Sequence, residues 1–269
     1  FTLAAQNGHL DTVEYLSTLK GVDIKHQNKY GHTAFTLAAL NGHLDTVKYL
    51  STLDGVDIKH QTKDGNTAFT LAACNGHLGT VKYLSTLDGV DINHQGKYGN
   101  TAFTWAAAIG HLDIVKYLLT LKGVDINHQN NIGFTAFTYA ARNGHLDTVK
   151  YLSTLDGVDI NHQDYIGDTA FTLAASKGHL DTVKYLSTLD GIDINHQNND
   201  GNTAFTLAAL EGHLDIVKYL SKLKGIDIKH QNKDGDTAFI LASCSGKLDI
   251  VKYLSTLKGI DIKHQNNDG

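Results

Sequence analysis

Apolar residues recur along the chain in two alternating short patterns. Within residues 31–64, the first pattern is an alanine-rich run from Ala34 to Leu40, which ends at Asn41-Gly42. The second places apolar residues at every third position, where they can share one helix face: Leu44, Val47, Leu50 and Leu53. We therefore predict two short helices, residues 34–40 and about 44–53.

The residues around these helices predict how each one begins and ends. Thr33 is a candidate N-cap of the first helix, because its hydroxyl can accept an amide hydrogen bond. Gly55 follows the second helix, where a left-handed residue is expected. The alternation Val56-Asp57-Ile58 predicts a short strand, and Lys63-Asp64-Gly65 predicts a tight turn. Each unit thus reads as two helices followed by a β-hairpin finger.

The same unit returns throughout the chain with a period of 34 residues. Eight phenylalanines mark the copies: Phe1, Phe35, Phe69, Phe103, Phe137, Phe171, Phe205 and Phe239. Such short helices are unstable alone, so stacked copies must bury a common core. We predict an all-α solenoid, a single array over residues 1–269 that curves with the first helices and fingers on its concave side. Because Phe1 begins partway through a copy, we expect the array to belong to a longer one.

The repeated motif resembles that of ankyrin-repeat proteins. It reads Gly31-x-Thr33-Ala34-Phe35-Thr36-Leu37-Ala38-Ala39-x-x-Gly42-His43-Leu44-x-x-Val47-x-x-Leu50 and covers essentially the whole chain. The family's Thr-Pro-Leu-His opening is Thr-Ala-Phe-Thr here, and the period is 34 residues in place of 33. We expect the added residue to extend the second helix near Leu53-Asp54. The resemblance implies protein binding through the fingers and the concave groove.

Composition and charge further restrict the classes of function that we expect. The net charge is −5. A chain with this charge is not expected to carry the strongly basic surface that is typical of nucleic-acid-binding proteins. No apolar run is long enough to cross a membrane. Cys74 and Cys244 are the only cysteines, five whole copies apart, and no Asn-x-Ser/Thr sequence occurs. We expect a monomeric, cytoplasmic protein that binds neither nucleic acid nor membranes.

The sixteen histidines suggest a metal site, but their spacing argues against one. Packed helices in successive copies lie ~8–10 Å apart, whereas a zinc–nitrogen bond is ~2.0–2.1 Å. We expect the histidines of the Gly-His pairs to bond to loop backbone. Those of the His-Gln pairs should fill space left where Thr36 and its equivalents replace the family's histidine. The sequence predicts no metal, no cofactor and no catalytic residue, since every candidate nucleophile has the same repeated neighbours.

The copies differ mainly at the fingertips and along the first helix, which are typical contact positions in ankyrin-repeat proteins. Large side chains gather there in copies four to six. They form our predicted partner-binding set, with the chain's single arginine: Tyr98, Trp105, Ile109, Ile132, Phe134, Tyr139, Arg142, Tyr165 and Ile166. Ile132 and Phe134 should lie on an exposed turn. Trp105 and Tyr139 replace an otherwise constant leucine, and either surface exposure or core packing is consistent with the sequence.

The sequence therefore predicts a non-catalytic scaffold that binds an unidentified protein near copies four to six. Exposed apolar residues among polar ones favour this interpretation. An alternative is a structural or mechanical spacer within a longer array, without a specific partner in this region. The near-identity of the copies favours the spacer, and drift would then explain the differences between them.

Overall fold

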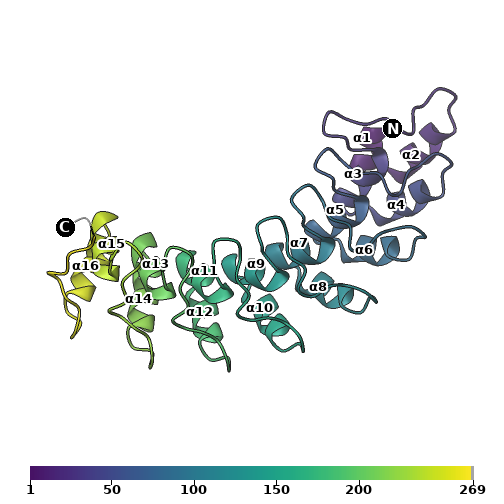
Figure 1. Cartoon of the computed structure of the whole chain (residues 1–269). Helices are drawn as coiled ribbons and strands as arrows, with labels where there is room; N and C mark the ends of the chain where they lie inside the picture. The colour runs from purple at the N-terminus through teal and green to yellow at the C-terminus, as the bar shows by residue number, and fades with distance from the viewer. Residues whose placement is uncertain (268–269) are drawn as a thin grey trace. The chain divides into compact units, whose positions relative to one another are not determined.

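The computed structural model describes residues 1–267, which form consecutive pairs of short α-helices (Figure 1). The first helix of each pair has an odd number: α1 (Thr2–Gln6), α3 (Ala34–Leu40), α5 (Ala68–Cys74), α7 (Ala102–Ile109), α9 (Ala136–Arg142), α11 (Ala170–Ser176), α13 (Ala204–Glu211) and α15 (Ala238–Cys244). The second has an even number: α2 (Leu10–Ser17), α4 (Leu44–Ser51), α6 (Leu78–Leu84), α8 (Leu112–Leu118), α10 (Leu146–Ser153), α12 (Leu180–Leu186), α14 (Leu214–Leu220) and α16 (Leu248–Leu254).

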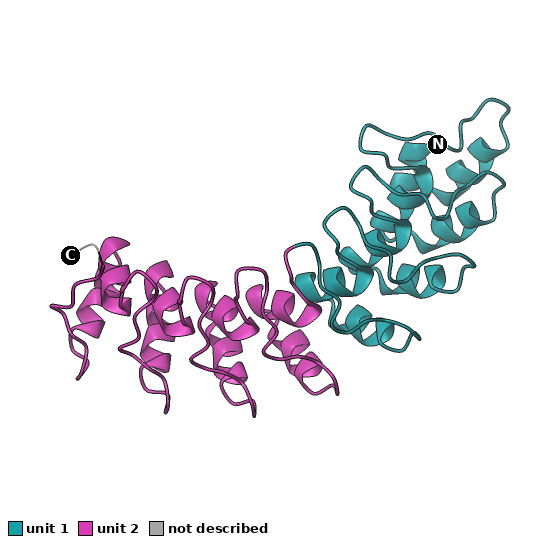
Figure 2. Ribbon diagram, viewed as in Figure 1, with its two compact units in different colours: residues 1–131 teal, residues 132–269 magenta. Residues whose placement is uncertain are grey.

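The pairs fall into two compact units, residues 1–131 and 132–269 (Figure 2). In the first unit, α1, α3, α5 and α7 pack side by side, and each also packs on the even-numbered helix of its own copy. The second unit repeats this arrangement with α9 to α16. The predicted all-α solenoid of stacked helix pairs is confirmed within each unit.

A reciprocal cap starts the odd-numbered helices from α3 to α13, as α3 illustrates. Thr33 Oγ1 accepts a hydrogen bond from the Thr36 amide, and the Thr33 amide donates to Thr36 Oγ1 over 2.9 Å. This capping box satisfies two amides that the first helical turn leaves without an internal partner. The threonine that replaces the family's motif histidine therefore completes the cap.

Small and aromatic side chains of the odd-numbered helices fill the core. Phe35, Ala38 and Ala39 of α3 are buried, as are Val47 and Leu50 of α4. Paired alanines allow neighbouring odd-numbered helices to approach closely, while one phenylalanine per copy fills the space between helices. Since each copy buries these residues against its neighbours, stability is shared along the stack.

The predicted extension of the second helix near Leu53-Asp54 is wrong. Helix α4 ends at Ser51, and the hydroxyls of Ser51 and Thr52 bond to the carbonyls of Lys48 and Tyr49 at 2.7 Å. These hydroxyls take up carbonyls that a longer helix would use, which favours termination. The chain turns after the helix, where Gly55 adopts a φ of 90°.

The predicted strand at Val56-Asp57-Ile58 is also wrong. Asp57 Oδ1 accepts the Lys59 amide at 2.9 Å, and the Asp57 carbonyl accepts the His60 amide at 3.2 Å. The side chain thus forms a local turn that competes with extended backbone. Within residues 1–267 the fingers are turns and not β-hairpins, and the only bridge is an isolated one between Gln231 and Thr237.

Each finger closes on itself and bonds to the next finger through backbone groups. In the second finger, Thr62 and Asn66 form a closing bond of 2.9 Å between amide and carbonyl. The amide of Lys63 then donates to the carbonyl of Tyr30, at the preceding fingertip, over 3.0 Å. The same bond recurs between later fingers of each unit, as from Lys97 to Asp64 and from Tyr165 to Ile132.

Candidate functional site

Three apolar side chains of the predicted set lie exposed on adjacent fingers of the second unit. Ile132, Tyr165 and Ile166 are 52%, 65% and 59% exposed. The amide of Tyr165 donates to the carbonyl of Ile132 over 3.2 Å, which places the two fingers side by side. A Cβ at Gly133 would lie 2.8 Å from Tyr165 Cδ1, so the tyrosine ring covers this glycine. We call these three residues the fingertip patch.

Phe134 corrects one prediction, because it is not on an exposed turn. Only 7% of it is exposed, and its ring meets that of Tyr139 edge to face, with centroids 4.8 Å apart and planes at 81°. Gly133 has a φ of 83°, a conformation that redirects the chain from the fingertip toward α9. Phe134 therefore belongs to the packing between the finger and its helix.

Arg142, at the end of α9, completes a cluster with these two rings. Its guanidinium carbon lies 5.8 Å from the centroid of Phe134, and Nη1 donates to Asn143 Oδ1 over 3.2 Å. Aromatic contact and a hydrogen bond together restrict the orientation of the guanidinium. We call Phe134, Tyr139 and Arg142 the Arg142 cluster. Tyr139 is half-buried within this cluster, so part of its side chain packs against Phe134 and part is exposed to solvent.

Next to Phe134, a ladder of amide side chains is interrupted. In four places an asparagine Nδ2 donates to an Oδ1 of the preceding copy: Asn130 to Asn100, Asn198 to Asp168, Asn232 to Asn202, and Asn266 to Asp236. Position 164 carries aspartate, and the corresponding residue of the preceding copy is Phe134, which has no side-chain oxygen. Asp164 Oδ1 accepts the amides of Ile166 and Asp168, each at 2.9 Å, just as Asn198 Oδ1 accepts those of Asp200 and Asn202.

Burial raises the pKa of both Asp164 and Asp168 above the usual value of an aspartate. The hydrogen bonds that each carboxylate accepts oppose this effect but do not cancel it. For Asp168 the nearby charge of Asp164 raises the pKa further. Two buried carboxyl groups therefore lie on the finger that follows Phe134, and the charge of Asp164 disfavours the ionised form of Asp168.

The remaining predicted residues lie in the first unit. Tyr98 is exposed at its fingertip, and its carbonyl accepts the Asn131 amide at 3.1 Å. Ile109 is exposed at the end of α7, before the left-handed Gly110. Trp105 is half-buried in α7, whereas Leu37 and Leu71 are buried at the same place. Of the nine predicted residues, three therefore lie in the first unit and six in the second.

Both histidine sets make backbone hydrogen bonds between copies. His43 Nε2 bonds to the carbonyl of Gln6 at 3.0 Å, and His77 does the same to Leu40 at 2.9 Å. These partners are helix ends of the preceding copy and not the loop that we expected. His60 Nε2 bonds to the carbonyl of Gly31 at 2.7 Å, and its ring is half-buried. Within residues 1–267, no group of three His, Cys, Asp or Glu residues is arranged to bind a metal.

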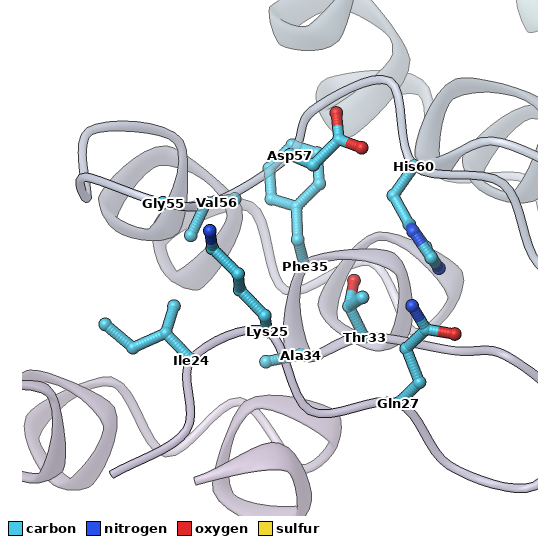
Figure 3. A pocket seen from close by; sticks show the side chains of 10 residues that line it. All are labelled: Ile24, Lys25, Gln27, Thr33, Ala34, Phe35, Gly55, Val56, Asp57 and His60. Carbon is cyan, nitrogen blue, oxygen red and sulfur yellow. The ribbon is translucent and has the colours of Figure 1, made fainter. Parts of the chain in front are cut away.

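A pocket that the sequence did not predict lies between the loops of the first two copies (Figure 3). It has a volume of 340 Å³ and combines apolar Ile24 and Phe35 with Lys25, Asp57 and His60. Lys25 points toward Gly55 (Figure 3), and a Cβ there would lie 3.2 Å from Lys25 Cε. Because His60 and Asp57 already bond to backbone groups, the pocket shows no paired nucleophile and base.

Similar pockets recur where lysine occupies the position of Lys25. Two others, of 160 and 170 Å³, include Lys59 and Lys229. Other copies carry asparagine there, and Asn161 and Asn195 each donate from Nδ2 to a glycine carbonyl of the next copy at 2.7 Å. The replacement of lysine by asparagine in the four middle copies is visible in the sequence. The structural role of this residue depends on which loop of the next copy it contacts, and the sequence alone does not show that contact.

A family model describing three consecutive ankyrin repeats matches the chain in overlapping stretches. They are residues 1–96, 86–164, 103–198, 154–232 and 171–266. The chain belongs to the ankyrin-repeat family. Ankyrin repeats are generally protein-interaction modules, which agrees with exposed variable residues on the fingers of this ankyrin array. No curated protein matches the chain.

The helices of this ankyrin array are short, as expected of the family. Within residues 1–267, none combines the length and the apolar character that crossing a bilayer would need. The Thr-Ala-Phe-Thr opening preserves the ankyrin helix start through its capping box, although the family's proline and histidine are absent.

Proposed function

We propose that this ankyrin array is a non-catalytic scaffold that binds a protein partner through its fingers and odd-numbered helices, centred on copies four to six. The observation that carries the proposal is the fingertip patch. Elsewhere the tip residue is mostly aspartate, at Asp64, Asp200 and Asp234. When a partner covers the exposed isoleucines and tyrosine on adjacent fingers, the burial of their apolar surface stabilises the complex.

The residues of the Arg142 cluster extend this proposed surface within the second unit. Tyr98 and Ile109 present exposed apolar atoms in the first unit. Aromatic residues and arginine are frequent among those that dominate binding energy at interfaces. Phe134 supports the surface from beneath, since it is buried, and is not a contact residue in the proposal.

The test uses substitutions that the array itself shows to be compatible with its fold. In an Ile132→Asp, Ile166→Asp variant, each tip carries the aspartate found at three other tips. A Tyr30→Asp variant is the matched control, because it makes the same kind of change on a distant finger. Affinity capture from cell extract should recover a protein with the wild type and the control, and lose it with the double variant. Circular dichroism should show equal helicity.

The alternative function is a structural spacer within a longer array. Contacts between copies recur almost unchanged, as in the bonds of 2.6 Å from Ser17 to Tyr49 and from Ser51 to Tyr83, which favours a mechanical role. A spacer predicts the same captured proteins, or none, for all three chains. We also propose an intracellular location and a monomeric state, supported by the sparse, widely separated cysteines and the mixed surface charge.

A further inference from the structure

We propose that Arg142 binds a carboxylate of the partner, and that the recognised partner segment carries an acidic residue beside apolar ones. The proposal rests on the scaffold function above and adds the chemistry of what the scaffold binds. Its components are the Arg142 cluster and the fingertip patch, which share one finger, because Ile132 of the patch and Phe134 of the cluster both lie on it. Ile132 is exposed at the tip, whereas Phe134, two residues further on, is buried against Tyr139.

The guanidinium of Arg142 is oriented but not neutralised. Phe134 lies against it, and Asn143 accepts one of its hydrogen bonds. None of the salt bridges found in residues 1–267 involves Arg142. A guanidinium has five N–H donors in a fixed plane that matches a carboxylate. An arginine held this way loses little conformational freedom when a carboxylate binds.

The charges near this arginine favour an acidic ligand. Lys177 follows α11 as its C-cap and is exposed, and α11 packs beside α9. Asp164 and Asp168 are the carboxylates of the adjoining finger, but both are buried. Their oxygens accept hydrogen bonds from backbone amides and from Thr172 and Asn198. Arg142 and the exposed Lys177 thus stand on two neighbouring copies of a chain whose net charge is −5.

The three members of the cluster are unusual at their own positions, and they contact one another. Phe134 stands where other copies have histidine, asparagine or aspartate, Tyr139 where six copies have leucine, and Arg142 is the chain's single arginine. Phe134 also interrupts the asparagine ladder and adjoins two buried carboxyl groups. Three contacting departures in one copy indicate a built site.

A carboxylate fits this site better than a phosphate group. Phosphorylated segments are usually recognised by clusters of arginines, which match the two negative charges. Here one guanidinium and one neighbouring lysine suit a single negative charge. The apolar fingertip patch, joined to the cluster through the same finger, supplies a surface for an aliphatic or aromatic neighbour of that charge.

The test uses a phage library of random 12-residue peptides selected on the intact wild-type chain. We expect recovered peptides to contain Asp or Glu next to an apolar residue, and to require Ile132 and Ile166 for binding. Synthetic copies of these peptides should bind Arg142→Leu at least ~10-fold more weakly than wild type, the loss expected of one charge-assisted pair. Leucine occupies this place in α3 and α13, so the variant should fold.

A double-substitution comparison separates direct carboxylate binding from a structural effect. Replacing the peptide's acidic residue by its amide should weaken binding to wild type, and should have little further effect on Arg142→Leu. Cys244→Leu is the control at the same helix position. A phosphorylated peptide that binds more tightly than the acidic one would overturn the carboxylate assignment.

Two further results would contradict the inference and are distinguishable. Peptides that need Ile132 and Ile166 but lack acidic residues, and bind Arg142→Leu unchanged, would overturn the role of Arg142 and leave the scaffold function intact. If no recovered peptide depends on the fingertip patch, both proposals fail. Binding that weakens as salt is added would accompany the expected outcome.

Discussion

Asn198 donates a hydrogen bond from Nδ2 to Oδ1 of Asp168, 3.1 Å away in the preceding copy. The same oxygen accepts the hydroxyl of Thr172 at 3.0 Å. Both donors stabilise the charged form of Asp168, although burial keeps its pKa above the usual value. The pair links two copies through buried side chains, and its strength depends on one partner being an amide.

Asn198→Asp should therefore destabilise the array at neutral pH. The substitution exchanges a buried hydrogen bond for two adjacent carboxylates, and we expect the unfolding free energy to fall by about 2–4 kcal/mol. Urea denaturation followed by circular dichroism at pH 7 measures the change. At about pH 4 the loss should shrink, since the two carboxyl groups can share a proton.

Asp168→Asn is the control for this prediction. Asn100 and Asn202 already occupy the equivalent position and accept the same bond. We expect this variant to be at least as stable as wild type at pH 7, because a buried charge is removed. An Asn198→Asp chain with an unchanged urea midpoint at pH 7 would contradict the proposed importance of the pair.

Gly42→Ala should be much more destabilising than most glycine substitutions. Gly42 has a φ of 74°, and a Cβ on it would overlap the ring of His77, lying 2.7 Å from Cε1. The ring is held in place by its bond to the carbonyl of Leu40. Backbone strain and overlap together should lower the unfolding free energy by about 3 kcal/mol or more.

Gly123→Ala isolates the strain from the overlap. Gly123 has a φ of 96°, but no atom lies within 4 Å of the position that a Cβ would occupy there. We expect this variant to lose about 1 kcal/mol, the usual penalty for a left-handed alanine. Equal melting temperatures for the two alanine variants would show that the histidine ring moves aside.

Thr80→Val should stabilise the array. Thr80 is buried in α6, and its Oγ1 has no hydrogen-bond partner among the described residues. Valine keeps the branched shape and removes the unsatisfied hydroxyl, which should raise the unfolding free energy by about 1 kcal/mol. Thr36→Val is the contrasting variant, because Thr36 Oγ1 accepts the Thr33 amide and its loss should be destabilising. A decrease in melting temperature for Thr80→Val would contradict this.

Mild acid should destabilise the array through particular histidines. Burial lowers the pKa of His32 and His179, so the unfolded chain binds protons that the folded chain does not. Their contribution to the unfolding free energy therefore decreases as pH falls below about 6.5, the ordinary histidine value. Thermal melts between pH 7.5 and 5.5 measure the slope. His32→Asn, the residue found at positions 66, 100 and 202, should make it shallower.

The buried aspartates act in the opposite direction. Because the pKa values of Asp164 and Asp168 are raised, the folded chain retains protons that the unfolded chain loses. Their contribution favours folding below about pH 3.8 and is lost as pH rises through the raised values. The Asp168→Asn variant should reduce this dependence at acidic pH, while leaving the histidine effect near pH 6 in place.

Local patterns in the sequence predicted the helices and their starts well. The boundaries of α3 and the Thr33 cap follow from an apolar run, an N-cap residue and a terminal glycine, all within a few residues of each other. The end of α4 and the absence of a strand at Val56 were missed. There, hydroxyl and carboxylate side chains bond to nearby backbone and override the helical and alternating patterns.

The candidate surface could be predicted only in part. The exposure of Ile132 and Ile166 followed from comparison of fingertips. The burial of Phe134 did not, because it depends on Tyr139 and Arg142 on a different element. The hydrogen-bond partners of His43 and His60 could not be predicted either, because each partner lies in the preceding copy and the contact depends on how the copies stack. To predict contacts of this kind, one needs the register between copies as well as the amino-acid sequence.

The bonds that join fingertip to fingertip are made by peptide groups alone. The carbonyl of Tyr30 accepts the Lys63 amide, and the carbonyl of Ile132 accepts the Tyr165 amide, whichever side chains those residues carry. Residue identity at the tips is therefore uncoupled from the connection that holds them in a row. The side chains at the tips can therefore be substituted one at a time, while the peptide groups keep the spacing between the fingers.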